Sequence, residues 1–373
     1  MQPAGALRPV WAEINLSAVE SNLRALRAAA GTKIMFVVKA DGYGHGAAAL
    51  AAFAQEKGLC DWFGVSCIEE GLELRRAGVS LPVLVLGSIY PFSGFDAALE
   101  AGLSVTVAGY DAAVHLERAA ARLGKTARCH IKIDTGMGRI GSRRPGAVKT
   151  AQFLAQSRSA VIEGVYTHLS SPDCDAAFTR LQLKHFDDAL DDMARLGINP
   201  GLRHAAGSYA ALNIPESRYD LIRPGLAAYG LMGDFIPALS LKSRIVFIKD
   251  MRAGASVSYN RSFRCQRPTR VATIPIGYGD GWNRRLSNCG CALVGGVRCR
   301  VLGNITMDMT MLDVTPIPDA KVGDEAALIG AQGGEAVTAQ EAASVAATIP
   351  YEITSALTRR VPRVYTAGQP PVF

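Results

Sequence analysis

Short apolar segments alternate with longer segments of helical periodicity over the first 240 residues. The apolar segments predict eight strands buried on both faces, at 34–38, 62–66, 83–86, 103–107, 129–133, 161–166, 202–204 and 221–222. The segments between them predict helices, most clearly at 47–57, 68–77, 111–123 and 178–196. Eight strand-helix units with right-handed crossovers predict a parallel (β/α)8 TIM barrel.

The pattern changes after about residue 239. Short runs rich in Val, Ile and Thr, interrupted by glycine and proline, predict strands at 243–249, 269–274, 292–294, 298–302 and 326–329. A chain of 373 residues is also long enough for two domains. We therefore expect an α/β protein with a barrel over 12–239, and a β-strand domain made of 1–11 plus 240–373.

Composition narrows the class of protein. Hydrophobic residues make up 49% of the chain and charged residues 20%, and no apolar run approaches the roughly 20 residues that cross a bilayer. Residues 1–9 lack the apolar core of a signal peptide, which favours a cytoplasmic protein. The net charge of +7 is spread along the chain in pairs such as Arg75-Arg76, so neither nucleic acid nor a membrane is an expected partner.

Neither the cysteines nor the glycine-rich segment at 136–141 indicates a metal site or a dinucleotide-binding site. The eight cysteines indicate reduced thiols, and the closest group, Cys289, Cys291 and Cys299, has no C-x2-C pair or suitably spaced histidine, so we expect no metal site. Residues 136–141 match G-x-G-x-x-G, but that fingerprint requires a helix to open within the loop, and Pro145 and Gly146 delay it.

Lys39 is the strongest candidate for chemistry. It follows the apolar segment 34–38 directly and precedes a glycine-rich turn, so it falls at the end of a strand where parallel-sheet folds place their active sites. Burial lowers the pKa of an amine and packing fixes its direction, and such an amine can form a Schiff base with an aldehyde. A surface lysine before an ordinary turn is the alternative that the local pattern leaves open.

Four motifs together resemble the alanine racemase family, and the resemblance runs from about Trp11 to Tyr365. In chain order they are Val-Val-Lys-Ala-Asp-Gly-Tyr-Gly-His-Gly at 37–46, Lys-Ile-Asp-Thr-Gly-Met-Gly-Arg at 132–139, Ile-Arg-Pro-Gly at 222–225 with Tyr-Gly at 229–230, and Ile-Gly-Tyr-Gly-Asp-Gly at 276–281. The resemblance implies a barrel that binds pyridoxal 5'-phosphate, followed by a β-domain with which a strand near residues 8–10 pairs.

The resemblance also implies the catalytic residues. Lys39 would carry the cofactor and, once displaced by an amino acid, act as one base. Racemisation is most simply done by two bases on opposite faces of Cα, and the family's second base matches Tyr259, contributed by the partner subunit of a homodimer with shared active sites. A tyrosine needs help to act near neutral pH, since its ordinary pKa is about 10.

Two further residues match the family's catalytic set. His168 matches the histidine that hydrogen-bonds both this tyrosine and the arginine equivalent to Arg223. Arg223 would face the cofactor's pyridine nitrogen. A guanidinium has no acceptor and stays charged, so it would keep that nitrogen unprotonated and limit side reactions such as transamination.

The remaining site residues also follow from the resemblance. The cofactor-binding set comprises Lys39, Tyr43, Arg139, His168, Ser208, Arg223, Gly225, Leu226 and Tyr351. Arg139 and the amide of Met307 would bind the substrate carboxylate, and Lys132 matches a lysine that is often carbamylated in the family. No metal is implied.

Several positions depart from the family's usual residues. Asn304 stands where the family commonly has arginine, Thr306 where it has cysteine, and Gly207 where it has asparagine, while Ser171 and Pro172 replace a usually alanine-rich loop. These positions lie near the expected substrate entrance. Strict preference for alanine is thus less secure than the reaction itself.

We expect an alanine racemase that supplies D-alanine for peptidoglycan precursors or takes part in alanine catabolism. A racemase of other small amino acids, such as serine, is the first alternative. A decarboxylase or D-threonine aldolase of the same architecture should lack Tyr259 or carry an acid in place of Arg223. A non-catalytic carrier of pyridoxal phosphate should end before the β-domain.

Overall fold

A computed structural model describes residues 7–368 of the chain. The described residues form two compact units, and each is described by itself. The barrel unit comprises 20–42 and 47–228, and the β unit comprises 7–19, 43–46 and 229–368. In this division residues 12–19, 43–46 and 229–239 group with the β unit, where Arg363 Nε donates to the Gly44 carbonyl oxygen at 3.0 Å.

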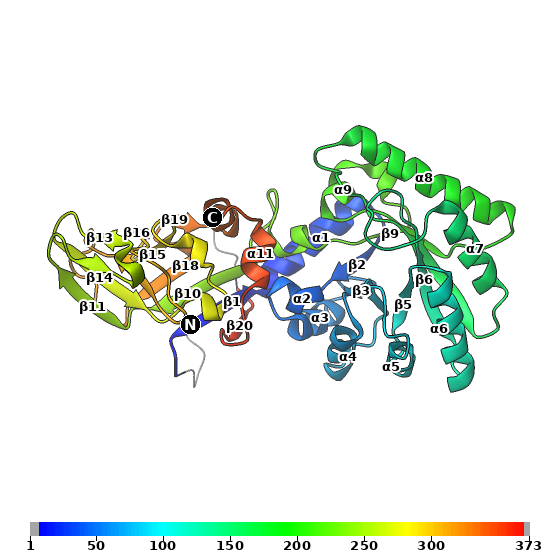
Figure 1. The fold of residues 1–373 in the computed structure, drawn as a ribbon, viewed down its shortest axis with the longest axis horizontal. Coiled ribbons are helices and arrows are strands. Elements are labelled where there is room, and N and C mark those ends of the chain that lie inside the picture. The colour runs from blue at the N-terminus through cyan, green and yellow to red at the C-terminus, as the bar shows by residue number, and fades with distance from the viewer. Residues whose placement is uncertain (1–6, 369–373) are drawn as a thin grey trace. The chain divides into compact units, whose positions relative to one another are not determined.

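The barrel unit is built on one eight-stranded parallel sheet of order β8-β7-β6-β5-β4-β3-β2-β9 (Figure 1). Its strands are β2 (Lys33–Val37), β3 (Trp62–Val65), β4 (Val83–Val85), β5 (Ser104–Val107), β6 (Ala127–Lys132), β7 (Ala160–Tyr166), β8 (Leu202–His204) and β9 (Leu221–Ile222). Backbone hydrogen bonds from Asp220 N to Arg203 O (3.0 Å) and from Arg223 N to Ala206 O (2.9 Å) join β9 to β8. They nearly close the barrel, as its class requires.

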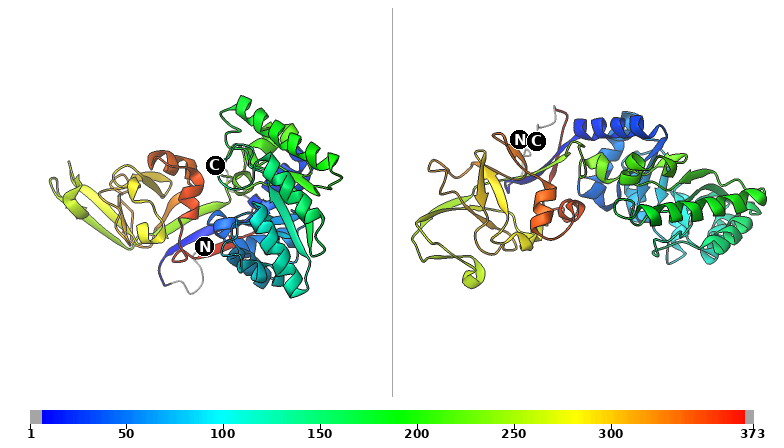
Figure 2. Two further views of the ribbon diagram at one scale, coloured as in Figure 1. Left: turned by 45° about the vertical axis from the view of Figure 1, so that its right-hand side comes forward. Right: turned by 90° about the horizontal axis from the view of Figure 1, so that it is seen from above.

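Helices surround these strands, and Figure 2 shows α7 and α8 on the outer side of the sheet. They are α1 (Leu16–Ala30), α3 (Ala47–Glu56), α4 (Ile68–Arg76), α5 (Gly94–Glu100), α6 (Tyr110–Leu123), α7 (Arg144–Ala155), α8 (Ala176–Arg195) and α9 (Ser208–Asn213), whereas the short element α2 (Lys39–Tyr43) after β2 has left-handed backbone. Strand side chains such as Met35, Trp62 and Leu84 form a buried cluster. The apolar runs therefore predict the barrel strands to within one or two residues.

The β unit contains a seven-stranded sheet of order β16-β15-β18-β10-β1-β20 with β19 paired to β18, a three-stranded sheet β11-β14-β17 and the pair β12-β13. Its strands are β1 (Val10–Asn15), β10 (Leu239–Arg244), β11 (Phe247–Met251), β12 (Ser256–Val257), β13 (Phe263–Arg264), β14 (Thr269–Ile274), β15 (Cys291–Val294), β16 (Val297–Arg300), β17 (Thr310–Asp313), β18 (Glu325–Gln332), β19 (Glu335–Val337) and β20 (Arg363–Thr366). Two short helices accompany them, α10 (Ala339–Val345) and α11 (Pro350–Ser355).

One predicted element is wrong. The apolar run 243–249 was expected to be a single strand, but the chain breaks at 245–246 and changes sheets, so that β10 pairs with β1 and β18 while β11 pairs with β14. Hydrophobic alternation does not encode such a change, because both strands are half-buried and alternate in the same way.

The described residues also bear on the expected environment of the chain. No helix among residues 7–368 combines the length and apolar content that a bilayer crossing requires. All eight cysteines are free thiols, and within the same range no three His, Cys, Asp or Glu side chains gather as a metal site would require.

Asp280 is a fully buried carboxylate that we expect to stabilise the β unit. It accepts from Arg8 Nη2 at 2.6 Å and from the Gly277 amide at 3.0 Å, and lies 3.3 Å from Arg360 Nε. Asp280→Ala leaves the Gly277 amide without its acceptor, while Arg8 keeps the Arg360 carbonyl oxygen and Arg360 keeps Asp308, so the free energy of unfolding in urea should fall by about 1–3 kcal/mol. The control Asp250→Asn removes an exposed partner of Arg270 and should cost less than about 1 kcal/mol. Equal losses would contradict this assignment.

Candidate active site

Lys39 lies two residues beyond β2, at the start of a left-handed turn. Ala40, Asp41 and Gly42 have φ values of 52°, 53° and 61°. Left-handed backbone costs roughly 1–2 kcal/mol for each residue that has a Cβ, so the turn must be held by its surroundings. Glu70 holds it, because its carboxylate accepts from the Ala40 amide at 2.7 Å and from the Ser66 amide, beyond β3, at 2.6 Å.

The surroundings of Lys39 lower its pKa. Burial is the main cause, and the guanidinium groups of Arg139 and Arg223 act in the same direction, while the Glu70 carboxylate opposes them. A lower pKa increases the fraction of neutral amine, which is the nucleophilic form. The geometry favours the reactive interpretation of Lys39 over an ordinary surface lysine.

Arg223 is the centre of the hydrogen-bond network at this end of the barrel. It follows β9, is only 6% exposed, and donates to the carbonyl oxygens of Thr167 (2.8 Å) and Ala205 (2.9 Å). Its guanidinium also contacts Nδ1 of His204 at 2.9 Å and Nδ1 of His168 at 3.1 Å. Burial lowers the pKa of Arg223 to about 10, which leaves it charged at neutral pH.

These contacts determine the protonation of both histidines. A guanidinium can only donate, so Nδ1 of His168 and Nδ1 of His204 must accept. Burial and the Arg223 charge hold the pKa of each imidazole well below its ordinary value. Both rings are therefore neutral and carry their proton on Nε2. His168 is consequently a hydrogen-bond donor at Nε2.

Lys132, the last residue of β6, is a second lysine with a perturbed pKa. Its Nζ donates to Ile133 O at 3.3 Å and lies 5.0 Å from the centre of the Tyr166 ring. Burial, reinforced by the Arg223 charge, lowers its pKa to about 7. The neutral form of the Lys132 amine is therefore favoured relative to that of an ordinary surface lysine.

Arg139 is exposed and donates no hydrogen bond within the described part of the chain, so its guanidinium is available to a ligand. The loop before it is held by Asp134, whose carboxylate accepts from the amides of Gly136 (3.1 Å) and Gly138 (3.0 Å). The next helix, α7, begins only at Arg144. The glycines at 136–141 thus form a loop, and no helix opens within it as the dinucleotide fingerprint requires.

Ser208 and the turn at 225–227 are brought together. Ser208 begins α9, and its hydroxyl accepts from the Gly225 amide at 3.1 Å and from the Ala227 amide at 3.2 Å. The Leu226 residue lies between these two amides. Gly207, just before Ser208, leaves space next to His168, because a Cβ there would lie 3.7 Å from the His168 ring.

Tyr43 and Tyr351 lie together in the β unit. Their ring centres are 6.5 Å apart, and Tyr229 lies 5.0 Å from Tyr43. Burial, reinforced by Tyr351, raises the pKa of Tyr43 to about 12. The Tyr43 phenol therefore keeps its proton and can donate a hydrogen bond.

Tyr259 is 69% exposed and lies in a strained turn of the β unit. Ser258, Asn260 and Arg261 around it all have positive φ. Asn304 clamps this turn: its Nδ2 donates to Tyr259 O at 3.0 Å, and its own carbonyl oxygen accepts from Ser258 Oγ at 2.5 Å. Asn304 thus supports the backbone of Tyr259.

Thr306 and Ser171, two other departures from the family's usual residues, make local hydrogen bonds, and Met307 is a predicted substrate contact. The Thr306 hydroxyl accepts from the Met309 amide and donates to the Met309 carbonyl oxygen, both at 3.0 Å, so it is satisfied within its own turn. Met307 is 53% exposed. The Ser171 carbonyl oxygen accepts from the Asp175 amide at 2.9 Å, where it precedes α8.

Three polar residues of the site, Tyr166, His204 and Glu70, are absent from the set expected from the sequence. Tyr166 stacks on His204 with ring centres 4.8 Å apart, and its ring centre lies 5.3 Å from the Arg223 guanidinium. Both are the last residues of their strands, β7 and β8, and that position is the signal that could have found them. Glu70, on α4, acts from a helix and has no such signal.

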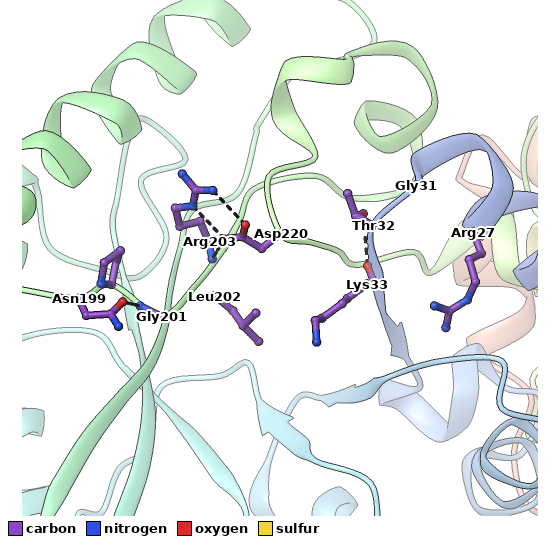
Figure 3. Close-up of a pocket in the computed structure, with 10 residues that line it drawn as sticks. Arg27, Gly31, Thr32, Lys33, Asn199, Gly201, Leu202, Arg203 and Asp220 are labelled. Atoms are coloured by element: carbon purple, nitrogen blue, oxygen red, sulfur yellow. Dashed lines mark hydrogen bonds and ion pairs between the residues drawn. The ribbon is translucent and has the colours of Figure 1, made fainter.

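A hollow of about 1070 Å³ opens at the opposite end of the barrel (Figure 3). Lys33, Leu202 and Asp220 place it at the amino ends of β2, β8 and β9. There Arg203 and Asp220 are paired with each other at 2.8 Å. Chemistry in parallel barrels occurs at the carboxyl ends, so this hollow is not the candidate active site.

The fold is a TIM-like barrel, and the carboxyl ends of its strands bring a partly buried lysine amine among cationic side chains, as in an enzyme that uses an amine for chemistry. Residues 14–233 match the model of the alanine racemase N-terminal domain, and 238–365 match that of the C-terminal domain. The chain belongs to the alanine racemase family, whose members are isomerases.

Individual relatives agree over almost the whole length. The alanine racemase of Symbiobacterium thermophilum is 44% identical over 96% of this chain and 97% of the relative. That of Halothermothrix orenii is 40% identical over 96% and 97%. The crystal structure of alanine racemase from the D-cycloserine producing Streptomyces lavendulae, 36% identical, has a TM-score of 0.92 and covers 97% of this chain and 98% of that one.

The Asn304 clamp leads to a prediction about the Tyr259 turn. Asn304→Ala removes one exposed hydrogen bond, so we expect a loss of at most about 1 kcal/mol in stability but faster amide hydrogen exchange at Arg261 and Ser262. The control Asn213→Ala removes a comparable bond, to Tyr209 O, in the barrel unit and should leave exchange at Arg261 and Ser262 unchanged. Unaltered exchange at Arg261 and Ser262 in Asn304→Ala would show that Asn304 does not stabilise the Tyr259 turn.

Proposed function

We propose that this chain interconverts L-alanine and D-alanine with pyridoxal 5'-phosphate bound at Lys39. The observation that carries the proposal is the Lys39 amine: it is held at a barrel-strand end by a strained turn, and its pKa is lowered by burial and by neighbouring guanidinium groups. Full-length similarity to alanine racemases supports the same reaction.

The residues present fit the cofactor. Its aldehyde requires a neutral amine, which the lowered pKa of Lys39 favours. A phosphate dianion requires donors, and in the barrel unit the Ser208 hydroxyl and the Leu226 amide can supply them, while the Gly225 amide donates to Ser208 Oγ and so orients that hydroxyl. We assign the phenols of Tyr43 and Tyr351 to the same ligand because the family resemblance implies them. The bound cofactor would supply an electron sink that makes the Cα proton of an attached amino acid acidic. Arg223 would donate to the ring nitrogen and, having no acceptor, leave it unprotonated.

We assign the two bases to Lys39 and Tyr259. The second would come from Tyr259 of the partner subunit in a homodimer, and its high exposure in a single chain agrees with a role outside its own fold. Because the proton of neutral His168 is on Nε2, this nitrogen can act as a hydrogen-bond donor. Its Nε2 proton would be donated to the phenol oxygen, which favours the phenolate and lowers the pKa of the tyrosine.

Substrate selection would involve Arg139 and the Met307 amide, which can bind a carboxylate. L-serine, whose side chain is larger than that of alanine by one hydroxyl, is the second candidate substrate, because Gly207 next to His168 lacks the side chain that the family commonly has at this position. The reaction would take place in the cytoplasm, in D-alanine supply or in alanine catabolism.

Tyr259→Phe tests the assignment of the second base. Because phenylalanine cannot accept a proton, D-alanine formation from L-alanine should fall by about 10²–10⁴-fold, and so should exchange of the L-alanine Cα proton with solvent deuterium. Chiral chromatography and NMR measure the two, with L-serine assayed in parallel. The control Tyr90→Phe alters a tyrosine that is 85% exposed and should have no effect. Undiminished proton abstraction in Tyr259→Phe would rule out this base.

We further propose that Lys132 is carbamylated, which turns a cation into an anion that can orient Arg139. The neutral amine attacks carbon dioxide and loses a proton, so the modification should form at pH 8 and disappear at pH 6, on either side of the Lys132 pKa of about 7. With 13C-bicarbonate, the carbamate NMR signal should vanish in Lys132→Arg and persist in Lys33→Arg, which alters an exposed lysine. An unmodified Lys132 at pH 8 would refute the proposal.

A further inference from the structure

A chain of buried polar side chains extends from Arg223 into the core of the barrel. Arg223 Nη1 contacts His204 Nδ1 at 2.9 Å, and His204 Nε2 contacts His130 Nδ1 at 2.9 Å. Both histidines are fully buried. His130 Nε2 has no partner within hydrogen-bond distance in the described part of the chain, but it lies 3.8 Å from Glu163 Oε2. Four neighbouring strands, β6 to β9, thus contribute to one line of side chains.

The direction of the proton donors along this line follows from its two ends. Arg223 can only donate, so His204 must accept at Nδ1 and, being neutral, carries its proton on Nε2. That proton is donated to Nδ1 of His130, whose own proton must then be on Nε2. Nε2 of His130 faces a carboxylate, which can only accept. Both ends therefore impose the same tautomer on both rings.

The residues packed around His130 restrict the position of its imidazole ring. Gly164 on β7 has no side chain where the ring lies, and a Cβ there would come within 2.3 Å of His130 Nδ1. The φ angle of Gly164 is not in the left-handed region, so glycine is needed here for space alone. The edge of Trp62 closes another side of the ring, with ring centres 5.2 Å apart.

Glu163 remains charged at the outer end of the line. Ser104 Oγ donates to Oε2 at 2.5 Å and Arg128 Nη1 donates to Oε1 at 3.1 Å. These hydrogen bonds, together with His130, outweigh the effect of burial and lower the pKa of Glu163. Its Oε2 is thus an ionised acceptor that faces His130 Nε2 at 3.8 Å.

We propose that Glu163 and His130 are positioning residues that hold His204 in a single tautomer and thereby fix the orientation of the Arg223 guanidinium. Hydrogen bonds in such a chain polarise one another, so a carboxylate at one end strengthens the acceptor that Arg223 meets at the other. The predicted effect on kcat rests on the proposed function, whereas the predicted tautomers of His130 and His204 are independent of it.

The test combines a spectroscopic and a kinetic measurement on the cofactor-loaded protein. 15N NMR of histidine-labelled wild type should show Nε2 protonated and Nδ1 unprotonated for His130 and His204. Glu163→Leu removes the acceptor and should give a mixture of His130 tautomers, with kcat lowered on the order of tenfold and KM for alanine unchanged. Glu163→Gln keeps an acceptor oxygen and should restore the single tautomer and most of kcat.

Two further variants keep the test decisive. The control Asp220→Asn removes a carboxylate paired with Arg203 at the same end of the barrel, and should change neither tautomers nor kcat. If Glu163→Leu does not fold, Gly164→Ala tests the same line, since its methyl group must displace His130 and should reproduce both effects.

A proton on Nδ1 of either wild-type histidine would overturn the proposal. So would a Glu163→Leu or Gly164→Ala variant with wild-type tautomers and kcat. Predicted tautomers in a protein that does not racemise alanine would instead contradict the proposed function and leave the positioning role standing.

Discussion

The candidate site depends on the convergence of four basic side chains at the carboxyl ends of the barrel strands. Lys39, Lys132, Arg139 and Arg223 are close enough for each arginine to lower the pKa of both lysines. Bringing like charges together in a partly buried place is unfavourable unless some of them lose their protons or an anion joins them. The lysines respond by becoming more readily neutral, while Arg223 stays charged. The remaining positive charge suits a phosphate dianion and a substrate carboxylate.

Arg223 also determines the direction of the hydrogen bonds around it. Because it can only donate, it fixes which nitrogen of each adjacent histidine carries the proton, and the two histidines then point their remaining donors in different directions. His168 presents its proton to the outside, where a phenol could use it. His204 donates a hydrogen bond from Nε2 to Nδ1 of His130, which lies in the barrel core. Arg223, which has no acceptor, therefore orients the proton donors of His168 and of the buried pair His204 and His130.

The sequence predicts the barrel well because strands buried on both faces are continuous apolar runs. Lys39 could be found for a related reason, since it interrupts such a run at its end. The contact between His130 and His204 joins residues 74 apart in sequence, and the Asn304 clamp on Tyr259 joins residues 45 apart. No local pattern encodes contacts of this kind. The run 243–249 predicts one strand where the structure has two, because a change of sheet leaves the alternation of buried and exposed positions intact.

The most direct test of the account is to find which amine binds the cofactor. Lys39 and Lys132 both have lowered pKa values, but only Lys39 lies on a strained turn that Glu70 holds in place. Protein loaded with pyridoxal 5'-phosphate is reduced with borohydride, and its peptides are mapped by mass spectrometry. We expect the pyridoxyl group on the peptide containing Lys39 alone. A label on Lys132 or on another lysine, or no label at all, would contradict it.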